Sequence, residues 1–253
     1  MILDRPKDQS QGVRFILHRW EEASATHPIY PGEVHIWQAT IPAAGFDEDR
    51  FRSLLSADEC ARMARFRFPN DRRNFLFCRS VLRILLASYL GRSPAKLLFA
   101  YSAHGKPSLA APPVNLEFNL SHSNGSLLLA TCLERRVGVD IEWVRRDLDF
   151  EGIARQFFSP RECRALAAVP ENIRHDAFFA CWTRKEAFVK AQGCGLSYPL
   201  CSFDVSTDSR EEAPQLIPPA SKTESWTLRS LNSYPGYAAA VALESCSREA
   251  GLF

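Results

Sequence analysis

Three short strands, predicted one after another in the middle of this 253-residue chain, constrain its fold more than any other feature. Leu116–Ser123 alternates apolar and polar residues, Ser126–Leu133 is an apolar run, and Val137–Glu142 alternates again. The turn residues Asn124-Gly125 and Glu134-Arg135-Arg136 separate them, so we expect each strand to return beside the one before it.

Two long amphipathic helices are also predicted. One begins at Asp71, and the other runs from about Asn172 to Gln192. Because the order strands, helix, strands occurs twice, we expect an α+β fold of two similar, pseudo-symmetric α/β subdomains. The predicted subdomains are residues 13–136 and 137–253, with a ligand site at their interface.

The composition fits a soluble globular protein and excludes some classes of function. Hydrophobic residues make up 46% and charged residues 24%, and the formal net charge is only +2, so we do not expect a nucleic-acid-binding protein. The eight cysteines include no Cys-x-x-Cys pair and no zinc-ligand spacing, which favours reduced thiols in a cytoplasmic protein. Residues 1–12 do not resemble a signal peptide, and no apolar run is long enough to predict a membrane span.

Asp140 and Glu142 are the first candidate ligands. They lie two residues apart on a predicted strand, so both carboxylates point to one side, with alpha carbons about 6.5 Å apart. Their oxygens could therefore bind one hard cation, and oxygen ligands favour Mg²⁺ or Mn²⁺ over zinc. The spacing alone is equally consistent with the exposed acidic face of an edge strand.

The second long helix carries the next candidates. Trp182, Glu186 and Lys190 follow at intervals of four residues and therefore share one face. An ordinary exposed ion pair would have the same spacing.

The first long helix and a short helix before it carry a basic flank. This flank is either a solvated helix face or a site for a phosphorylated ligand, because the guanidinium fork matches phosphate geometry. Its arginines are Arg62, Arg65, Arg72, Arg73, Arg79 and Arg83.

Two further polar positions precede or form turns. The strand Leu116–Ser123 ends in Ser121-His122-Ser123, where side chains can reach a ligand, and Lys106 lies at the tip of another turn. Each is more often structural than functional when taken alone.

Taken together, these residues predict a metal and phosphate site. Asp140, Glu142 and Glu186 offer three carboxylates for one Mg²⁺ and leave positions open for water and phosphate oxygens. Lys190, one helical turn beyond Glu186, is placed to meet the charge of the same phosphates, and His122 with Lys106 would add donors.

Five motifs follow one another between about Leu55 and Leu243. They are Gly105-Lys106-Pro107, Phe118–Ser123, Gly138–Glu142, Phe158–Glu162, and Trp182–Lys190 followed by Gly193–Ser197. In this order and spacing they resemble one known family, the 4'-phosphopantetheinyl transferases, and within it the larger two-lobed type similar to the surfactin-synthetase activator.

The resemblance implies an activity, transfer of the phosphopantetheine arm of coenzyme A to a serine of an apo carrier protein with release of adenosine 3',5'-bisphosphate. By similarity, Asp140, Glu142 and Glu186 hold Mg²⁺ (Mn²⁺ as an alternative), Lys190 contacts phosphate, and Glu186 is the favoured general base. The resemblance assigns Arg62 a place near the 3'-phosphate. The coenzyme-binding residues that it implies are Arg62, Lys106, Asn119, Ser121, His122 and Lys190.

The implied partners are acyl, peptidyl or aryl carriers of a polyketide, nonribosomal peptide or fatty acid synthase, and the two-lobed type suggests a monomer. The chain departs from the pattern at Glu59, where relatives often have a basic residue, and Arg72 with Arg73 could compensate. Two rival functions stay open: a Mg²⁺-dependent hydrolase of nucleotide pyrophosphates, and a non-catalytic coenzyme A binding module.

Overall fold

The computed structural model describes residues 13–23, 26–42, 45–111, 115–217, 225–232 and 234–245. The seven cysteines in these ranges are free thiols, as expected, whereas Cys246 and residues 1–12 lie outside them. None of the helices in the described ranges combines the length and apolar character needed to cross a membrane.

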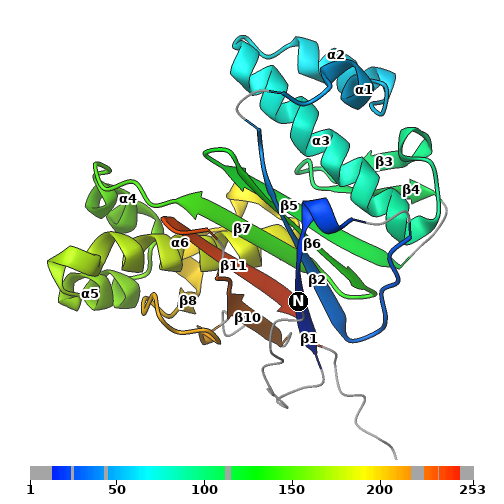
Figure 1. The fold of residues 1–253 in the computed structure, drawn as a ribbon. Helices are drawn as coiled ribbons and strands as arrows, with labels where there is room; N and C mark the ends of the chain where they lie inside the picture. The colour runs from blue at the N-terminus through cyan, green and yellow to red at the C-terminus, as the bar shows by residue number, and fades with distance from the viewer. Residues whose placement is uncertain are drawn as a thin grey trace, which may run out of the picture.

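Helices and strands alternate in groups along the chain (Figure 1). The helices are α1 (Glu48–Arg52), α2 (Ala57–Ala64), α3 (Pro69–Leu90), α4 (Phe150–Phe157), α5 (Pro160–Ala168) and α6 (Glu171–Gln192). The strands are β1 (Arg14–Arg19), β2 (Glu33–Thr40), β3 (Leu98–Tyr101), β4 (Pro107–Ala111), β5 (Leu116–Ser123), β6 (Ser126–Leu133), β7 (Val137–Trp143), β8 (Asp204–Val205), β9 (Leu216–Ile217), β10 (Trp226–Ser230) and β11 (Tyr237–Glu244). Short 3₁₀ turns are Trp20–Glu22, Pro94–Lys96, Gly195–Ser197 and Leu200–Ser202.

The first sheet has the strand order β1-β2-β6-β5 and is covered by α3. Strand β1 runs parallel to β2, and the other pairs are antiparallel. Alternate residues of β6, Leu127 and Leu129, pack with Val81 and Leu85 of α3 in one buried cluster. This alternation is the period of two that a strand imposes on its side chains.

The second sheet has the antiparallel order β10-β11-β7 and is covered by α6. Phe178 and Phe188 of α6 pack with Ala240 and Ala242 of β11, whose small side chains let the helix lie close to the sheet. Gly193 ends α6 in the left-handed conformation at φ 72°, as a C-terminal glycine does.

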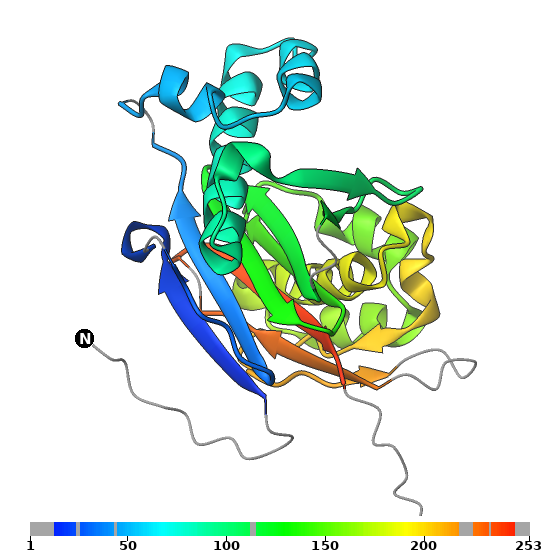
Figure 2. The same cartoon turned by 90° about the vertical axis from the view of Figure 1, so that its right-hand side faces the viewer.

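The inner faces of the two sheets pack against each other. Ile36 and Leu128 of the first sheet share a buried cluster with Val139, Ile141 and Val241 of the second. The layers therefore run α3, first sheet, second sheet, α6, and Figure 2 shows α3 and the α4–α6 helices on opposite sides of the strands.

The expectation that Val137–Glu142 returns beside the preceding strand is wrong. Strand β6 already has β2 on one edge and β5 on the other, so no edge is free for β7. Glu134 turns the chain at φ 61°, and β7 instead pairs with β11 in the second sheet.

The α+β prediction is confirmed, and each half of the chain contributes one larger sheet, one two-stranded sheet (β3-β4 or β8-β9) and one long helix among the described residues. The boundary between residues 136 and 137 falls between the two sheets, but the division into subdomains 13–136 and 137–253 stays a prediction. Sequence patterns missed the short helix α1 and the strand β4, because neither has enough residues to show a period.

Candidate active site

Strands β5 and β7 lie side by side where the two sheets meet, and polar side chains of β5 join them by bonding to backbone and side-chain groups of β7. We call this junction the seam. Asn119 Oδ1 accepts a hydrogen bond from the Val139 amide at 2.9 Å, and Ser123 Oγ donates to Glu142 Oε2 at 2.7 Å. Because polar residues recur at every second position of β5, they all face β7 and hold its carboxylates in register.

Asp140 is the centre of the seam and is almost fully buried, at 2% exposure. Its Oδ1 accepts from Ser121 Oγ at 2.8 Å and from Lys190 Nζ at 2.6 Å. Lys190 also donates to Ser121 Oγ at 2.9 Å, so a strand of each sheet and helix α6 meet at one ion pair. The alternative of an exposed acidic face is therefore excluded for Asp140.

Gly138 explains how α6 comes so close to β7. A Cβ atom at this position would lie 2.1 Å from the Ala187 carbonyl oxygen and 2.3 Å from the Ala191 amide nitrogen. Only glycine allows this contact, and it presents Glu186 and Lys190 beside Asp140.

Glu142 and Glu186 complete an acidic group around Asp140. Burial, and then the nearby Asp140 charge, raise the pKa of Glu186, and the Glu142 charge adds to this. Burial also raises the pKa of Glu142, and the Asp140 charge adds to it although the Ser123 hydrogen bond opposes it. We call Asp140, Glu142, Glu186 and Lys190 the Asp140 cluster. It holds three acids and one base.

The donor set of this cluster fits a hard divalent cation. Asp140 Oδ2 and Glu186 Oε1 are buried and have no hydrogen-bond partner. A buried carboxylate oxygen without a partner is costly, and Mg²⁺ or Mn²⁺ prefers such oxygens.

Two other predicted coenzyme-binding residues, Lys106 and His122, lie outside the Asp140 cluster. Lys106, on the β3–β4 turn, donates to the carbonyl oxygens of Val137 at 3.2 Å and Ala191 at 3.1 Å, and its burial lowers its pKa. His122 lies on the face of β5 opposite to Ser121 and remains accessible, although desolvation and then the Lys190 charge lower its pKa.

Arg62 lies on an element that takes no part in the seam. It is exposed on α2, which lies above the sheets at the top of Figure 1, and its guanidinium stacks on the Phe75 ring at 5.6 Å. Its proposed contact with the 3'-phosphate stays a prediction.

The prediction of a basic flank on α3 is wrong for Arg79 and Arg83. Arg79 and Arg83 are buried at 9% and 1% exposure and both bind the carboxylate of Glu59, Arg83 at 2.7 Å. Burial alone would raise the pKa of Glu59, but the Arg83 hydrogen bond and the Arg79 charge outweigh it and lower the pKa. We call these three residues the Glu59 cluster. This pairing explains why the chain has an acid at position 59, where relatives often have a basic residue. Glu59 neutralises two buried arginines.

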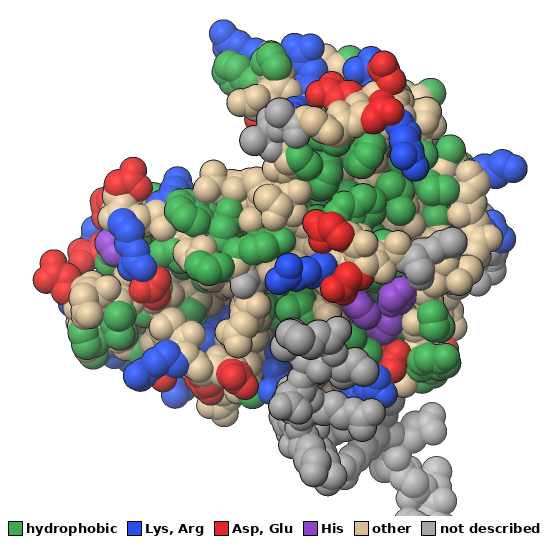
Figure 3. Space-filling view, viewed as in Figure 1, with side chains coloured by type: hydrophobic (Ala, Val, Ile, Leu, Met, Phe, Trp, Pro, Cys, Tyr) green, Lys and Arg blue, Asp and Glu red, His purple; other side chains and the backbone are tan. Residues whose placement is uncertain are grey.

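Two of the remaining arginines have contacts within the protein. Arg72 donates to the Phe66 carbonyl oxygen at 3.1 Å, and Arg73 lies 3.7 Å from the carboxylate of Glu48. On the face seen in Figure 3, Lys and Arg side chains are interspersed with acidic ones. Compensation for Glu59 by Arg72 and Arg73 stays a prediction.

Lys185, next to Glu186, has a purely structural environment. Its ammonium is fully buried, lies 2.8 Å from Glu162 Oε1, and donates to the carbonyl oxygens of Leu200 and Phe203. Three acceptors satisfy its three protons, so it is not available to a ligand.

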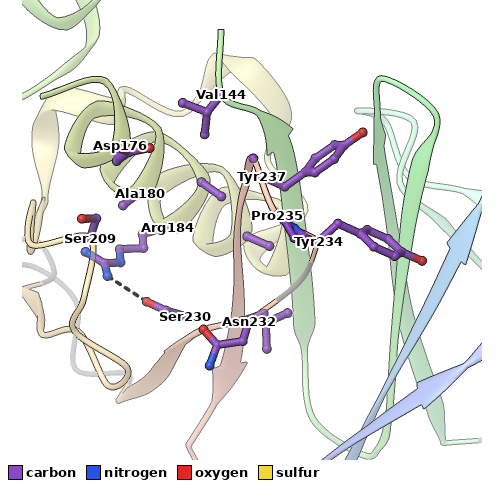
Figure 4. Close-up of a pocket in the computed structure, with 14 residues that line it drawn as sticks. Val144, Asp176, Ala180, Arg184, Ser209, Ser230, Asn232, Tyr234, Pro235 and Tyr237 are labelled. Carbon is purple, nitrogen blue, oxygen red and sulfur yellow. Dashed lines mark hydrogen bonds between the residues drawn. The ribbon is translucent and has the colours of Figure 1, made fainter. Parts of the chain in front are cut away.

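A cavity of about 420 Å³ lies on the other side of α6 from the Asp140 cluster. Asp176, Ala180 and Arg184 line it, one helical turn apart, and Figure 4 shows Arg184 reaching Ser230 at 2.7 Å. Arg184 also binds two backbone carbonyl oxygens, so its charge holds the surrounding loop in place. The cavity therefore contains no carboxylate of the cluster and is separate from the candidate site.

Sequence reasoning missed Ser123 and Gly138 as residues that position the site. The signal for Ser123 was available, because it shares the face of β5 that carries Asn119 and Ser121. Gly138 could not be found in this way, since its partner backbone is about fifty residues away in the sequence.

Two family models match successive parts of this chain. Residues 136–242 match the 4'-phosphopantetheinyl transferase superfamily, and residues 47–134 match the family described as 4'-phosphopantetheinyl transferase, N-terminal. The chain is 35% identical to the 4'-phosphopantetheinyl transferase HetI of a Nostoc species, over 89% of this chain and 94% of that protein. It is 30% identical to the 4'-phosphopantetheinyl transferase Sfp of Bacillus subtilis, over 65% and 71%.

Among solved structures, the holo-[acyl-carrier-protein] synthase of Thermotoga maritima matches at 23% identity and a TM-score of 0.32, over 43% of this chain and 62% of that one. The two family matches together span most of the chain, and HetI is similar along nearly its whole length. This chain therefore belongs to the 4'-phosphopantetheinyl transferase superfamily.

Proposed function

We propose that this chain transfers the 4'-phosphopantetheine arm of coenzyme A to a serine hydroxyl of an apo carrier protein and releases adenosine 3',5'-bisphosphate. The observation that carries the proposal is the Asp140 cluster, with its excess of acids and its two unpaired buried oxygens. Membership of the superfamily supports it, since HetI and Sfp both bear the name of this activity.

The carboxylates of Asp140, Glu142 and Glu186 would hold one Mg²⁺, with Mn²⁺ as an alternative. When bound, this ion supplies positive charge to the pyrophosphate oxygens, which carry the charge of a phosphoryl-transfer transition state. The two unpaired oxygens, Asp140 Oδ2 and Glu186 Oε1, supply donors of the type that such an ion prefers.

Lys190 would meet the same phosphates from the helix side. Its ammonium is held by Asp140 at 2.6 Å and by Ser121 at 2.9 Å, which fixes its position before the substrate arrives. A positioned charge needs little reorganisation during the reaction, and this is the main source of electrostatic catalysis.

Glu186 would accept the proton of the attacking serine, directly or through water. The serine oxygen bonds to the β-phosphorus of coenzyme A, which carries the pantetheine arm. The bond from that phosphorus to the bridging oxygen breaks, and adenosine 3',5'-bisphosphate leaves. Burial, and then the Asp140 and Glu142 charges, raise the pKa of Glu186 above its ordinary value in the metal-free protein.

The coenzyme would extend from the seam toward the first sheet. Lys106, Asn119, Ser121 and His122 lie on or near the seam and are proposed to contact it, and Arg62 is proposed to bind the 3'-phosphate.

Intact-protein mass spectrometry tests the proposal with coenzyme A, Mg²⁺ and a panel of apo acyl, peptidyl and aryl carriers. A carrier mass increase by one phosphopantetheine is expected, and the panel ranks the acceptors. Release of nucleotide product without a carrier would instead indicate hydrolysis, and coenzyme binding without turnover would indicate a binding module.

Lys190→Ala should weaken coenzyme binding and slow transfer together, because the lysine acts on phosphate charge. Lys96→Ala, at an exposed lysine of a 3₁₀ turn, is the matched control. Equal kinetics for the two variants would remove Lys190 from the site.

A further inference from the structure

Three histidines from separate segments converge beside the first sheet, away from the seam. His18 lies at the end of β1, His27 in the segment that follows, and His35 on β2. One ring nitrogen of each lies within 4.8 Å of the others, and histidine side chains gather at one place on the right of Figure 3. In the part of the chain that the structure describes, no other group of three or more His, Cys, Asp or Glu side chains is this close.

The rings are packed in place rather than scattered on the surface. His18 stacks on the Trp37 ring with centroids 4.5 Å apart, and His27 meets the same ring edge-on at 4.8 Å. The main chain of His27 is fixed by a hydrogen bond from its amide to the Ser88 carbonyl oxygen at 3.1 Å. His35 is 3% exposed.

Neighbouring groups determine which nitrogen of His35 carries a lone pair. Its Nε2 lies 3.2 Å from Glu33 Oε2, and a carboxylate only accepts, so Nε2 carries the proton. Trp37 Nε1 donates to the Tyr89 hydroxyl at 2.6 Å, and that hydroxyl therefore donates to His35 Nδ1 at 2.8 Å. A carboxylate on the far nitrogen is the usual support of a metal-binding histidine.

His18 Nε2 points to a ligand that the protein does not supply. This nitrogen is buried and has no hydrogen-bond partner. Burial, and then the other two histidines, lower the pKa of His18 to about 4, and burial also lowers the pKa of His27 and His35. The rings are therefore neutral near pH 7, as metal ligands must be.

We propose that His18, His27 and His35 bind one divalent transition-metal ion of the zinc class. Imidazole suits Zn²⁺ and its neighbours and not Mg²⁺, so this site is distinct from the Asp140 cluster. Nitrogens around tetrahedral zinc lie about 3.4 Å apart, given Zn–N bonds of about 2.0–2.1 Å, so the rings need only small rotations inward. The Tyr89 hydroxyl gives up His35 Nδ1 to the metal.

The ion would fasten the edge of the first sheet. Strand β1 is an edge strand, held through its pairing with β2, and a metal shared by His18 and His35 adds a second connection between these two strands. Zinc should therefore raise the thermal unfolding temperature of the protein, since a ligand that binds only the folded state stabilises it.

Titration of tag-free protein with Co²⁺ tests the proposal through its visible absorption, followed by displacement with Zn²⁺. One equivalent should bind with the intense absorption of a four- or five-coordinate site, and this signal should be lost in His18→Ala and, independently, in His27→Ala. Glu33→Gln should lower the affinity about 10- to 100-fold. Tyr89→Phe should not lower it, because the hydroxyl competes with the metal.

Two controls separate this site from other metal binding. His175→Ala removes a histidine that packs on Phe150 in α4, and it should bind Co²⁺ like the wild type. Glu186→Gln changes the Asp140 cluster and should also leave the Co²⁺ absorption intact. No binding to the wild type, binding that survives both His18→Ala and His27→Ala, or loss of the signal in Glu186→Gln would overturn the proposal.

Discussion

The Glu59 cluster and the Asp140 cluster are both buried and charged, but their charges are balanced differently. In the Glu59 cluster two arginines surround one acid, and both oxygens of Glu59 accept hydrogen bonds. In the Asp140 cluster one lysine faces three acids, and two buried oxygens have no partner.

The difference separates a structural ion pair from a ligand site. A fully paired buried acid holds two helices, α2 and α3, together, and it has nothing left to offer a ligand. A buried excess of acid lowers the stability of the free protein, so a chain retains it where a bound cation restores the balance. Glu186 and Lys185, neighbours on α6, fall on opposite sides of this distinction.

The largest effect is expected for Glu186→Gln. The transfer rate should fall about 10²- to 10⁴-fold, because the variant loses the proposed metal ligand and the proposed proton acceptor. The unfolding temperature without Mg²⁺ should not fall, since the substitution removes repulsion from Asp140 and Glu142. Initial rates by mass spectrometry and thermal unfolding measure the two quantities. Glu151→Gln, at an exposed acid of α4, is the control, and equal rates for both variants would contradict the assignment.

Glu59→Gln should show the opposite pattern. It leaves Arg79 and Arg83 buried without their counter-charge, so the free energy of unfolding should fall by about 3–5 kcal/mol. Urea denaturation measures this, and the transfer rate of the remaining folded protein should stay close to that of the wild type. Asp58→Asn, which changes the exposed acid next to Glu59, is the control. A similar loss of stability in that variant would contradict the role of the buried Glu59 ion pairs.

The smallest effect is expected in the pH dependence of folding stability. Ionisation of Glu186 should lower the stability, whereas ionisation of Glu59 should raise it. Glu186 has a pKa raised above 4.5, so its ionisation costs the folded state stability as the pH rises through and above 4.5. Glu59 has a pKa lowered below 4.5, so its contribution is present above 4.5 and is lost as the pH falls through its folded pKa.

Unfolding free energies measured from acid to neutral pH without Mg²⁺ check this contrast. Relative to Glu186→Gln, the wild type should lose stability as the pH rises. Relative to Glu59→Gln, it should lose stability as the pH falls. Saturating Mg²⁺ should reduce only the first of these differences, and a common sign for both would refute the comparison.

Local patterns in the sequence predict much of this fold. The apolar run predicts β6 at its observed bounds, Ser126–Leu133, and the spacing of Trp182, Glu186 and Lys190 predicts one face of α6. These features depend on residues within one element, where periodicity is informative. The same holds for Asp140 and Glu142, whose shared side follows from the strand period alone.

Features that depend on another part of the chain could not be predicted in this way. Arg79 and Arg83 have the sequence spacing of an exposed basic flank, and only the position of Glu59 on α2 makes them a buried pair of counter-charges. The pairing of β7 with β11 was missed for the same reason, because the occupied edges of β6 are a property of the whole sheet.

The contact at Gly138 also fixes the distance between α6 and β7 at the Asp140 cluster. Glu186 and Lys190 are separated from Asp140 by a spacing that backbone atoms of α6 and β7 set, not side chains. Substitutions on the outer face of either element therefore leave Glu186 and Lys190 in place relative to Asp140. The Gly138 contact thus makes the geometry of the Asp140 cluster independent of the side chains on the outer faces of α6 and β7.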